Sequence, residues 1–199
     1  EPFNVSRTSP APSSRKEAKA KDSISAQTAP TGNQWHLSVI GANKAGTPPA
    51  TTPVVAVLDT GVDYNHPDLA GKIILGKDYV DDDMDPMDMH GHGTHCAGLV
   101  GAKGAYLVRG VSPNTKILAV RVLNADGSGS SFDIMAAIVW ARKQAGVKIL
   151  SMSFGGYYQE GASDYTAYKK VIDDTVAAGV IPVASAGNDY NYYLYYYQS

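Results

Sequence analysis

Three short motifs hold side chains of the kinds that acyl-transfer chemistry uses. They are Asp59-Thr60-Gly61, His92-Gly93-Thr94 and Ala186-Gly187-Asn188. A carboxylate can orient an imidazole, the imidazole can act as a general base, and an amide can donate a hydrogen bond to a developing oxyanion. The sequence therefore predicts a hydrolytic site to which Asp59, His92 and Asn188 contribute.

The segments around these motifs alternate between strand and helix patterns. Runs of β-branched and apolar residues predict strands at 54–58, 116–123, 148–154 and 181–186, and helical spacing predicts helices at 131–144 and 164–178. This alternation predicts an α/β fold with a mostly parallel sheet and helices on both faces. Asp59, Ser153 and Asn188 follow strands, so we expect them at the carboxyl edge of the sheet. We expect His92 near the start of a buried helix.

Composition limits the classes of protein to which the chain can belong. With 199 residues, 44% hydrophobic content and a formal charge of −2, it can form one globular domain and shows no basic footprint for nucleic acid. No apolar run is long enough to span a membrane. Residues 1–33 are rich in Pro, Ser, Thr and Lys, which predicts a linker or a pro-segment remnant ahead of a domain at 34–199.

The histidines also permit a metal site as an alternative. His90, His92 and His95 are close in sequence, but they lack the glutamate of the His-Glu-x-x-His zinc pattern, so acid–base chemistry is preferred. Cys96 is the only cysteine, which excludes an internal disulfide. We interpret it as inert packing beside the histidine.

In this order the motifs resemble those of the subtilisin-like serine proteases, and most of all the thermitase and proteinase K branches. The match continues through Gly110-Val111-Ser112-Pro113, 119–123 and Asp126-Gly127-Ser128-Gly129. The resemblance implies a three-layer, subtilisin-like fold in which Asp59 orients His92, His92 is the general base and Asn188 belongs to the oxyanion hole. It also implies a secreted or extracellular endopeptidase.

The same resemblance implies how a polypeptide substrate binds. An extended peptide would pair with exposed backbone edges. The two predicted edges are Gly127-Ser128-Gly129 on one side and Ser153-Phe154-Gly155 on the other. Besides substrates, the chain's own pro-segment is an expected partner for these edges.

An acidic run precedes the histidine motif. Six aspartates fall between positions 78 and 88, and such a density of like charge favours binding of a cation with hard oxygen ligands. The run is not an EF-hand, but it resembles a calcium loop of thermitase-like proteins. That resemblance implies structural calcium held by Asp78, Asp81, Asp83 and the carbonyl of Asp85.

The nucleophile of the family is not found in this sequence. Subtilases carry it in a Gly-Thr-Ser-Met-Ala type motif well beyond the asparagine, and no such motif occurs between Glu1 and Ser199. The tyrosine-rich segment 190–199 also departs from the family pattern. We therefore expect a C-terminally truncated catalytic domain. The alternative is a catalytically inactive fragment or pseudoprotease that binds extended peptides.

Overall fold

A five-stranded parallel sheet forms the centre of the computed structural model, which describes residues 3–4, 34–45, 52–106, 108–156 and 162–188. The strand order is β3-β4-β2-β6-β7, and every neighbouring pair is parallel. The strands are β2 (Val54–Asp59), β3 (Ile73–Asp78), β4 (Ile117–Arg121), β6 (Val147–Met152) and β7 (Ile181–Ala184). The four predicted strands are confirmed, each shifted by only a few residues.

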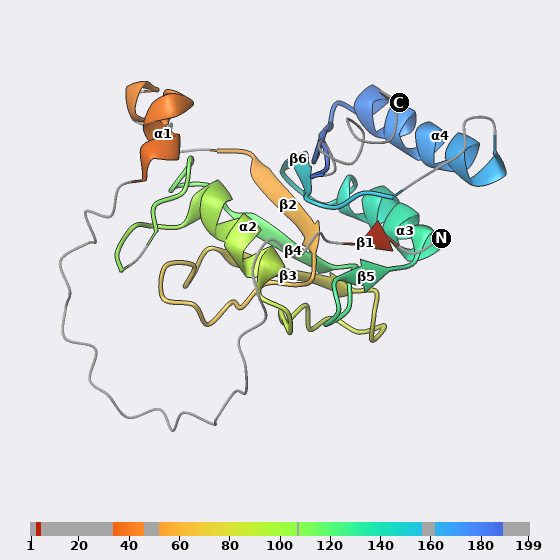
Figure 1. Cartoon of the computed structure of the whole chain (residues 1–199), viewed down its shortest axis with the longest axis horizontal. Helices are drawn as coiled ribbons and strands as arrows, with labels where there is room; N and C mark the ends of the chain where they lie inside the picture. Colours follow the sequence, from red (N-terminus) through yellow and green to blue (C-terminus); the bar gives the residue numbers. More distant parts are fainter. Residues whose placement is uncertain (1–2, 5–33, 46–51, 107, 157–161, 189–199) are drawn as a thin grey trace, which may run out of the picture.

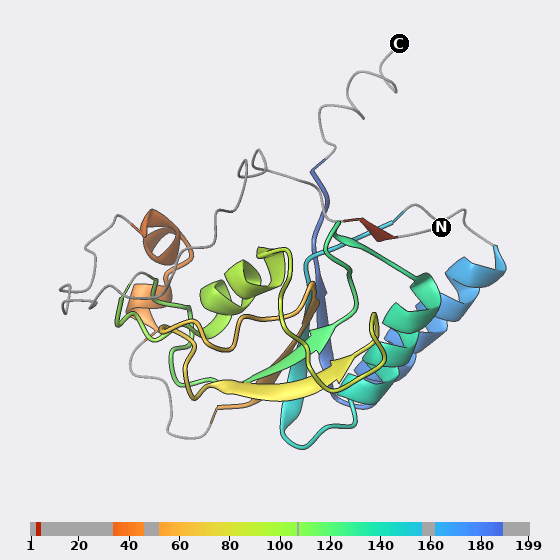
Figure 2. The same cartoon turned by 90° about the horizontal axis from the view of Figure 1, so that it is seen from below.

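Helices cover both faces of this sheet (Figures 1 and 2). Helix α2 (His92–Gly101) lies on one face, and α3 (Ser131–Ala141) and α4 (Ser163–Ala177) lie on the other. The central strand β2 serves both layers because its side chains alternate between the faces. Val55 and Val57 pack with α2, whereas Ala56 and Leu58 pack with α3. The predicted three-layer α/β architecture is confirmed.

Strand β3 was not predicted from the sequence. Only its first three residues, Ile73-Ile74-Leu75, are apolar, and Ile74 and Leu75 are 41% and 49% exposed at the edge of the sheet. Gly76 explains how it packs against β4. A Cβ atom there would lie 2.3 Å from the carbonyl oxygen of Ala119, so the two backbones approach too closely for any other residue.

A short helical segment precedes the sheet. Helix α1 (Trp35–Val39) is followed by the 3-10 turn η1 (Ala42–Lys44). The Gln34 side chain fixes this segment to the domain because it exchanges two hydrogen bonds with the backbone of Arg109. No helix in the described part of the chain is long and apolar enough to cross a membrane.

A second, two-stranded sheet lies beside the carboxyl edge. Strand β1 (Phe3–Asn4) pairs antiparallel with β5 (Ser128–Gly129), with Phe3 opposite Gly129 and Asn4 opposite Ser128. A segment from the predicted linker thus occupies one of the backbone edges predicted for substrate (Figure 1). The rest of the predicted linker and the tyrosine-rich segment lie outside the described residues.

Candidate active site

Asp59 is the last residue of β2, and its side chain is fully buried. Its Oδ1 atom accepts a hydrogen bond of 2.7 Å from the backbone N–H of Thr60. Its Oδ2 atom is buried and has no partner within the described residues. A buried carboxylate with spare acceptor capacity favours a nearby cation or proton donor.

His92 begins α2, as the sequence predicted. The chain enters the helix at Gly91, whose φ of 100° lies in the region that glycine adopts without strain. Gly93 then lets the first turn lie directly against the loop after β2, because a Cβ atom there would lie 2.0 Å from the carbonyl oxygen of Gly61. These two glycines bring the imidazole to the end of the central strand.

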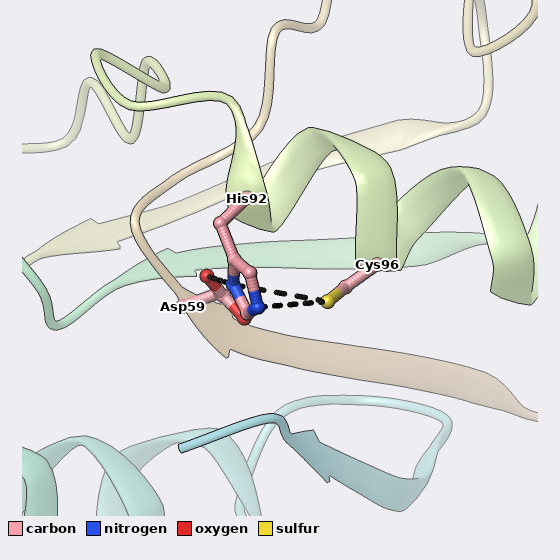
Figure 3. Close-up of side chains that lie close together, drawn as sticks. All are labelled: Asp59, His92 and Cys96. Carbon is pink, nitrogen blue, oxygen red and sulfur yellow. Dashed lines mark hydrogen bonds and ion pairs between the residues drawn. The ribbon is translucent and has the colours of Figure 1, made fainter. Parts of the chain in front are cut away.

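The two side chains form a hydrogen-bonded pair (Figure 3). Nδ1 of His92 lies 2.7 Å from Oδ1 of Asp59, and the His92 side chain is 24% exposed. The hydrogen bond to Asp59, with a smaller contribution from Cys96, raises the pKa of His92 to about 10 and outweighs the opposing effect of burial. The buried carboxylate therefore favours the imidazolium form, which is the role that a triad aspartate plays.

Cys96 lies one helical turn after His92 and faces its ring (Figure 3). Its sulfur is 3.9 Å from Nδ1 and 4.0 Å from Nε2 of His92. Asp59, His92 and Cys96 form the one group among the described residues in which three potential metal ligands lie within 4.8 Å of one another. His90 and His95 are not part of it, so the three histidines do not form a metal site with one another.

Asn188 lies beyond β7, two strands away from Asp59 across the same edge of the sheet. It is exposed, and it makes no hydrogen bond within the part of the chain that the structure describes. Gly187 before it has a φ of 83°. The position on the carboxyl edge agrees with the sequence prediction, but no contact joins Asn188 to the Asp59–His92 pair.

The two predicted substrate edges differ in the contacts that they already make within the protein. The edge formed by Gly127, Ser128 and Gly129 contains β5, which is paired with β1. In the second edge, between Ser153 and Gly155, the Phe154 side chain is buried in the core against α3 and α4, so only its backbone can face a ligand. The Phe154 carbonyl also accepts a hydrogen bond of 3.2 Å from Ser185 Oγ, which ties this segment to the end of β7.

The side chains of the predicted calcium loop bind other groups of the protein in the structure. Asp78 is buried, and its carboxylate and that of Asp81 both accept hydrogen bonds from the Arg121 guanidinium. The Asp83 side chain accepts from the Asp85 backbone N–H, and the Asp85 side chain accepts from the Tyr64 hydroxyl. No three of these carboxylates lie within 4.8 Å of one another, so the carboxylates alone do not form a preformed cage.

Three residues near the pair were not singled out by the sequence. The carboxylate of Asp88 binds Thr60 and Thr94, and the Thr60 hydroxyl accepts from the backbone N–H of Gly93. Thr60 and Thr94 stand inside the two motifs, and Asp88 stands four residues before His92. Their proximity in sequence to the two motifs is the signal that could have identified them.

The fold and the pair define a parallel α/β protein with an Asp–His site at its carboxyl edge. The chain belongs to the subtilase family, whose sequence pattern matches residues 50–198. This match confirms the resemblance drawn from the motifs.

The proteins that this chain resembles are consistent with its membership of the family. The thermophilic serine proteinase of Bacillus sp. (strain AK1) is 44% identical over 137 residues, which are 68% of this chain and 33% of that protein. Thermitase of Thermoactinomyces vulgaris is 40% identical over 136 residues, which are 67% of this chain and 47% of that protein. The solved structure of the S41 psychrophilic protease has a TM-score of 0.66 and 33% identity, covering 78% of this chain and 52% of that chain. The chain thus spans between a third and about half of the proteins it matches.

Proposed function

We propose that this chain is the part of a serine endopeptidase that carries the aspartate and histidine of an Asp-His-Ser triad. The observation that supports this most is the 2.7 Å hydrogen bond between the buried Asp59 carboxylate and His92 Nδ1 at the carboxyl edge of the sheet. Asp59 fixes the ring and stabilises its protonated form, and the His92 ring would exchange a proton with a serine hydroxyl. Asn188, on the same edge, would donate to the oxyanion.

The serine itself is proposed to lie outside this sequence. No Gly-Thr-Ser motif occurs among its 199 residues, so His92 has no family nucleophile to activate here. The test is the source gene: a reading frame that continues past Ser199 into a Gly-Thr-Ser motif would support the endopeptidase. A stop codon directly after Ser199 would instead favour a protein without acyl-transfer chemistry.

Polypeptides are the proposed substrates, and the pairing of β1 with β5 supports a mode of binding for them. The two residues of β1 pair antiparallel with β5 at the edge assigned to substrate. An extended peptide would make the same kind of backbone pairing, so Phe3–Asn4 would act as an internal ligand. This supports the pro-segment as a partner of the site.

A second candidate follows from the same pairing. A catalytically inactive fragment or pseudoprotease would keep the β5 edge and bind extended peptides without cleaving them. The two candidates differ in one measurable property. The complete endopeptidase requires a serine that reacts with acylating or phosphonylating probes, whereas a pseudoprotease would have none even in its complete form.

We also propose that the acidic run binds calcium and that the protein is extracellular. Arg121 pairs with Asp78 and Asp81, and Lys77 pairs with Asp82, so part of the charge of the acidic run is already balanced. Because Asp83 and Asp85 have no cationic partner in the described structure, we propose that calcium binds there, with Asp78, Asp81, Asp83 and the Asp85 carbonyl as its ligands. An extracellular location is proposed from the family resemblance.

A further inference from the structure

Asp88 belongs to the acidic run, but its carboxylate has an environment that differs from that of the other aspartates. Oδ1 accepts hydrogen bonds from Thr60 Oγ1 at 2.8 Å, from the His90 backbone N–H at 2.9 Å and from the Gly91 backbone N–H at 2.8 Å. Oδ2 accepts from the backbone N–H of Thr94 at 2.8 Å and from its hydroxyl at 2.6 Å. One side chain thus holds five donors in the segment around His92 and in the loop after Asp59.

The backbone donors lie on both sides of His92. The N–H groups of the first turn of a helix have no partner within the helix, and a carboxylate at this end also interacts favourably with the helix dipole. Asp88 supplies the acceptor for Gly91 ahead of His92 and for Thr94 after it. The backbone that carries the imidazole is therefore fixed at two points by a single carboxylate.

Thr60 extends this arrangement to the other member of the pair. Its backbone N–H donates to Asp59 Oδ1 at 2.7 Å, and its hydroxyl donates to Asp88 and accepts from the Gly93 N–H at 2.9 Å. A continuous path of hydrogen bonds runs from Asp59 through Thr60 and Asp88 to the residues flanking His92. The position of the ring relative to the carboxylate depends on this path.

Asp88 does not act on the imidazole directly. The titratable groups that face the His92 ring are Asp59 at the end of β2, Cys96 on α2 and His90, whose ring centroid lies 6.3 Å away. Asp59 and Cys96 are the groups that raise the pKa of His92, and Asp88 is not among them. Any effect of Asp88 on the pair must therefore pass through the backbone and Thr60.

We propose that Asp88 is a positioning residue that sets the Asp59–His92 hydrogen bond by holding the backbone on both sides of His92 to Thr60. Its relevance to catalysis rests on the function proposed above, but the geometry can be tested without activity. The alternative is a carboxylate that only stabilises the start of α2. Such a helix cap would change the free energy of unfolding without changing the hydrogen bond of the pair.

Nuclear magnetic resonance of the 199-residue chain, with histidine labelled by nitrogen-15, separates these alternatives. The readouts are the low-field Nδ1 proton of His92 and the pKa of its ring. Thr60→Val removes the hydroxyl link without changing any charge, and Asp88→Asn replaces one acceptor oxygen by an amide donor that faces N–H groups. Thr60→Ser keeps the hydroxyl, and Asp133→Asn removes a carboxylate from the first turn of α3 as a matched control.

We expect Thr60→Val and Asp88→Asn to shift or broaden the Nδ1 proton and to lower the pKa of His92 by about one unit or more, a tenfold change in proton affinity. Thr60→Ser and Asp133→Asn should leave both readouts unchanged. A folded Thr60→Val protein with an unaltered resonance and pKa would overturn the proposal, and this variant decides the matter if Asp88→Asn does not fold. Finding a reactive serine elsewhere in the chain would alter the proposed function but not this result.

Discussion

Oδ1 of Asp59 and Nδ1 of His92 lie 2.7 Å apart, although the 32 residues from 60 to 91 lie between them in the sequence. The fold produces this distance because β2 ends in the middle of the sheet and α2 starts directly above that end (Figure 3). Gly93 makes the approach physically feasible.

The pair should make stability depend on pH. The folded-state pKa of His92 is about 10, above the ordinary value of 6.5, so the bound proton stabilises the folded state. This contribution is fully present below pH 6.5 and is lost as the pH rises through about 10. The gain below pH 6.5 is on the order of a few kcal/mol. Urea unfolding between pH 6 and pH 10 should therefore show a steeper loss of stability for the native chain than for His92→Gln. Equal slopes for the two proteins would contradict the ion pair.

Gly93 should be essential for packing, in contrast to Gly98 in the same helix. Gly93→Ala would place a methyl group 2.0 Å from the carbonyl oxygen of Gly61, so α2 must move away from β2 at a cost of about 1–3 kcal/mol. Gly98→Ala meets no atom within 4 Å and should be neutral or stabilising by about 0.5–1 kcal/mol. Urea denaturation measures both effects. Equal stabilities of the two variants would show that α2 does not pack as described.

The strand β1 should compete with external peptides. Deletion of residues 1–4 frees the β5 edge, so a fluorescent extended peptide should bind the shortened chain at least several-fold more tightly than the native chain. Fluorescence anisotropy provides the dissociation constants. If both chains bind the peptide with the same affinity, β1 does not occupy the β5 edge in solution.

Calcium should stabilise the acidic run, residues 78–88. Binding to the folded state raises the melting temperature by about 2–4 °C for each kcal/mol of binding free energy. We expect this increase in the native chain and in Asp173→Asn, which removes an exposed carboxylate on α4, but not in the double variant Asp83→Asn plus Asp85→Asn. Identical melting curves in calcium and in a chelator would show that Arg121 and Lys77 suffice as counter-charges.

Much of this structure follows from local sequence patterns. The buried run Val54–Asp59 and the glycines around His92 predicted both the central strand and the start of α2, because burial and close approach restrict the residue types strongly. Strand β3 was not predicted, because an edge strand needs only a few apolar residues and its sequence pattern is therefore weak. The pairing of Asp78 with Arg121 could not be predicted either, since it depends on two strands 43 residues apart becoming neighbours.

The site was predictable to the extent that its residues lie in motifs. Asp59 and His92 were identified and do meet, whereas the five hydrogen bonds to Asp88 depend on the exact path of the loop before α2. The burial of Phe154 was also missed, because a strand-end aromatic residue can face either the core or a ligand. Periodicity cannot distinguish these two outcomes once the strand has ended.

The most direct test of the conclusion that residues 1–199 carry the aspartate and histidine without a working nucleophile is the intact mass of the purified chain after exposure to a fluorophosphonate probe. Such probes phosphonylate a serine that an adjacent histidine activates. We expect no change in mass, because Asp59 and His92 are present without the family nucleophile. One stoichiometric adduct that disappears in His92→Ala would contradict this conclusion and would show that the chain contains a working serine.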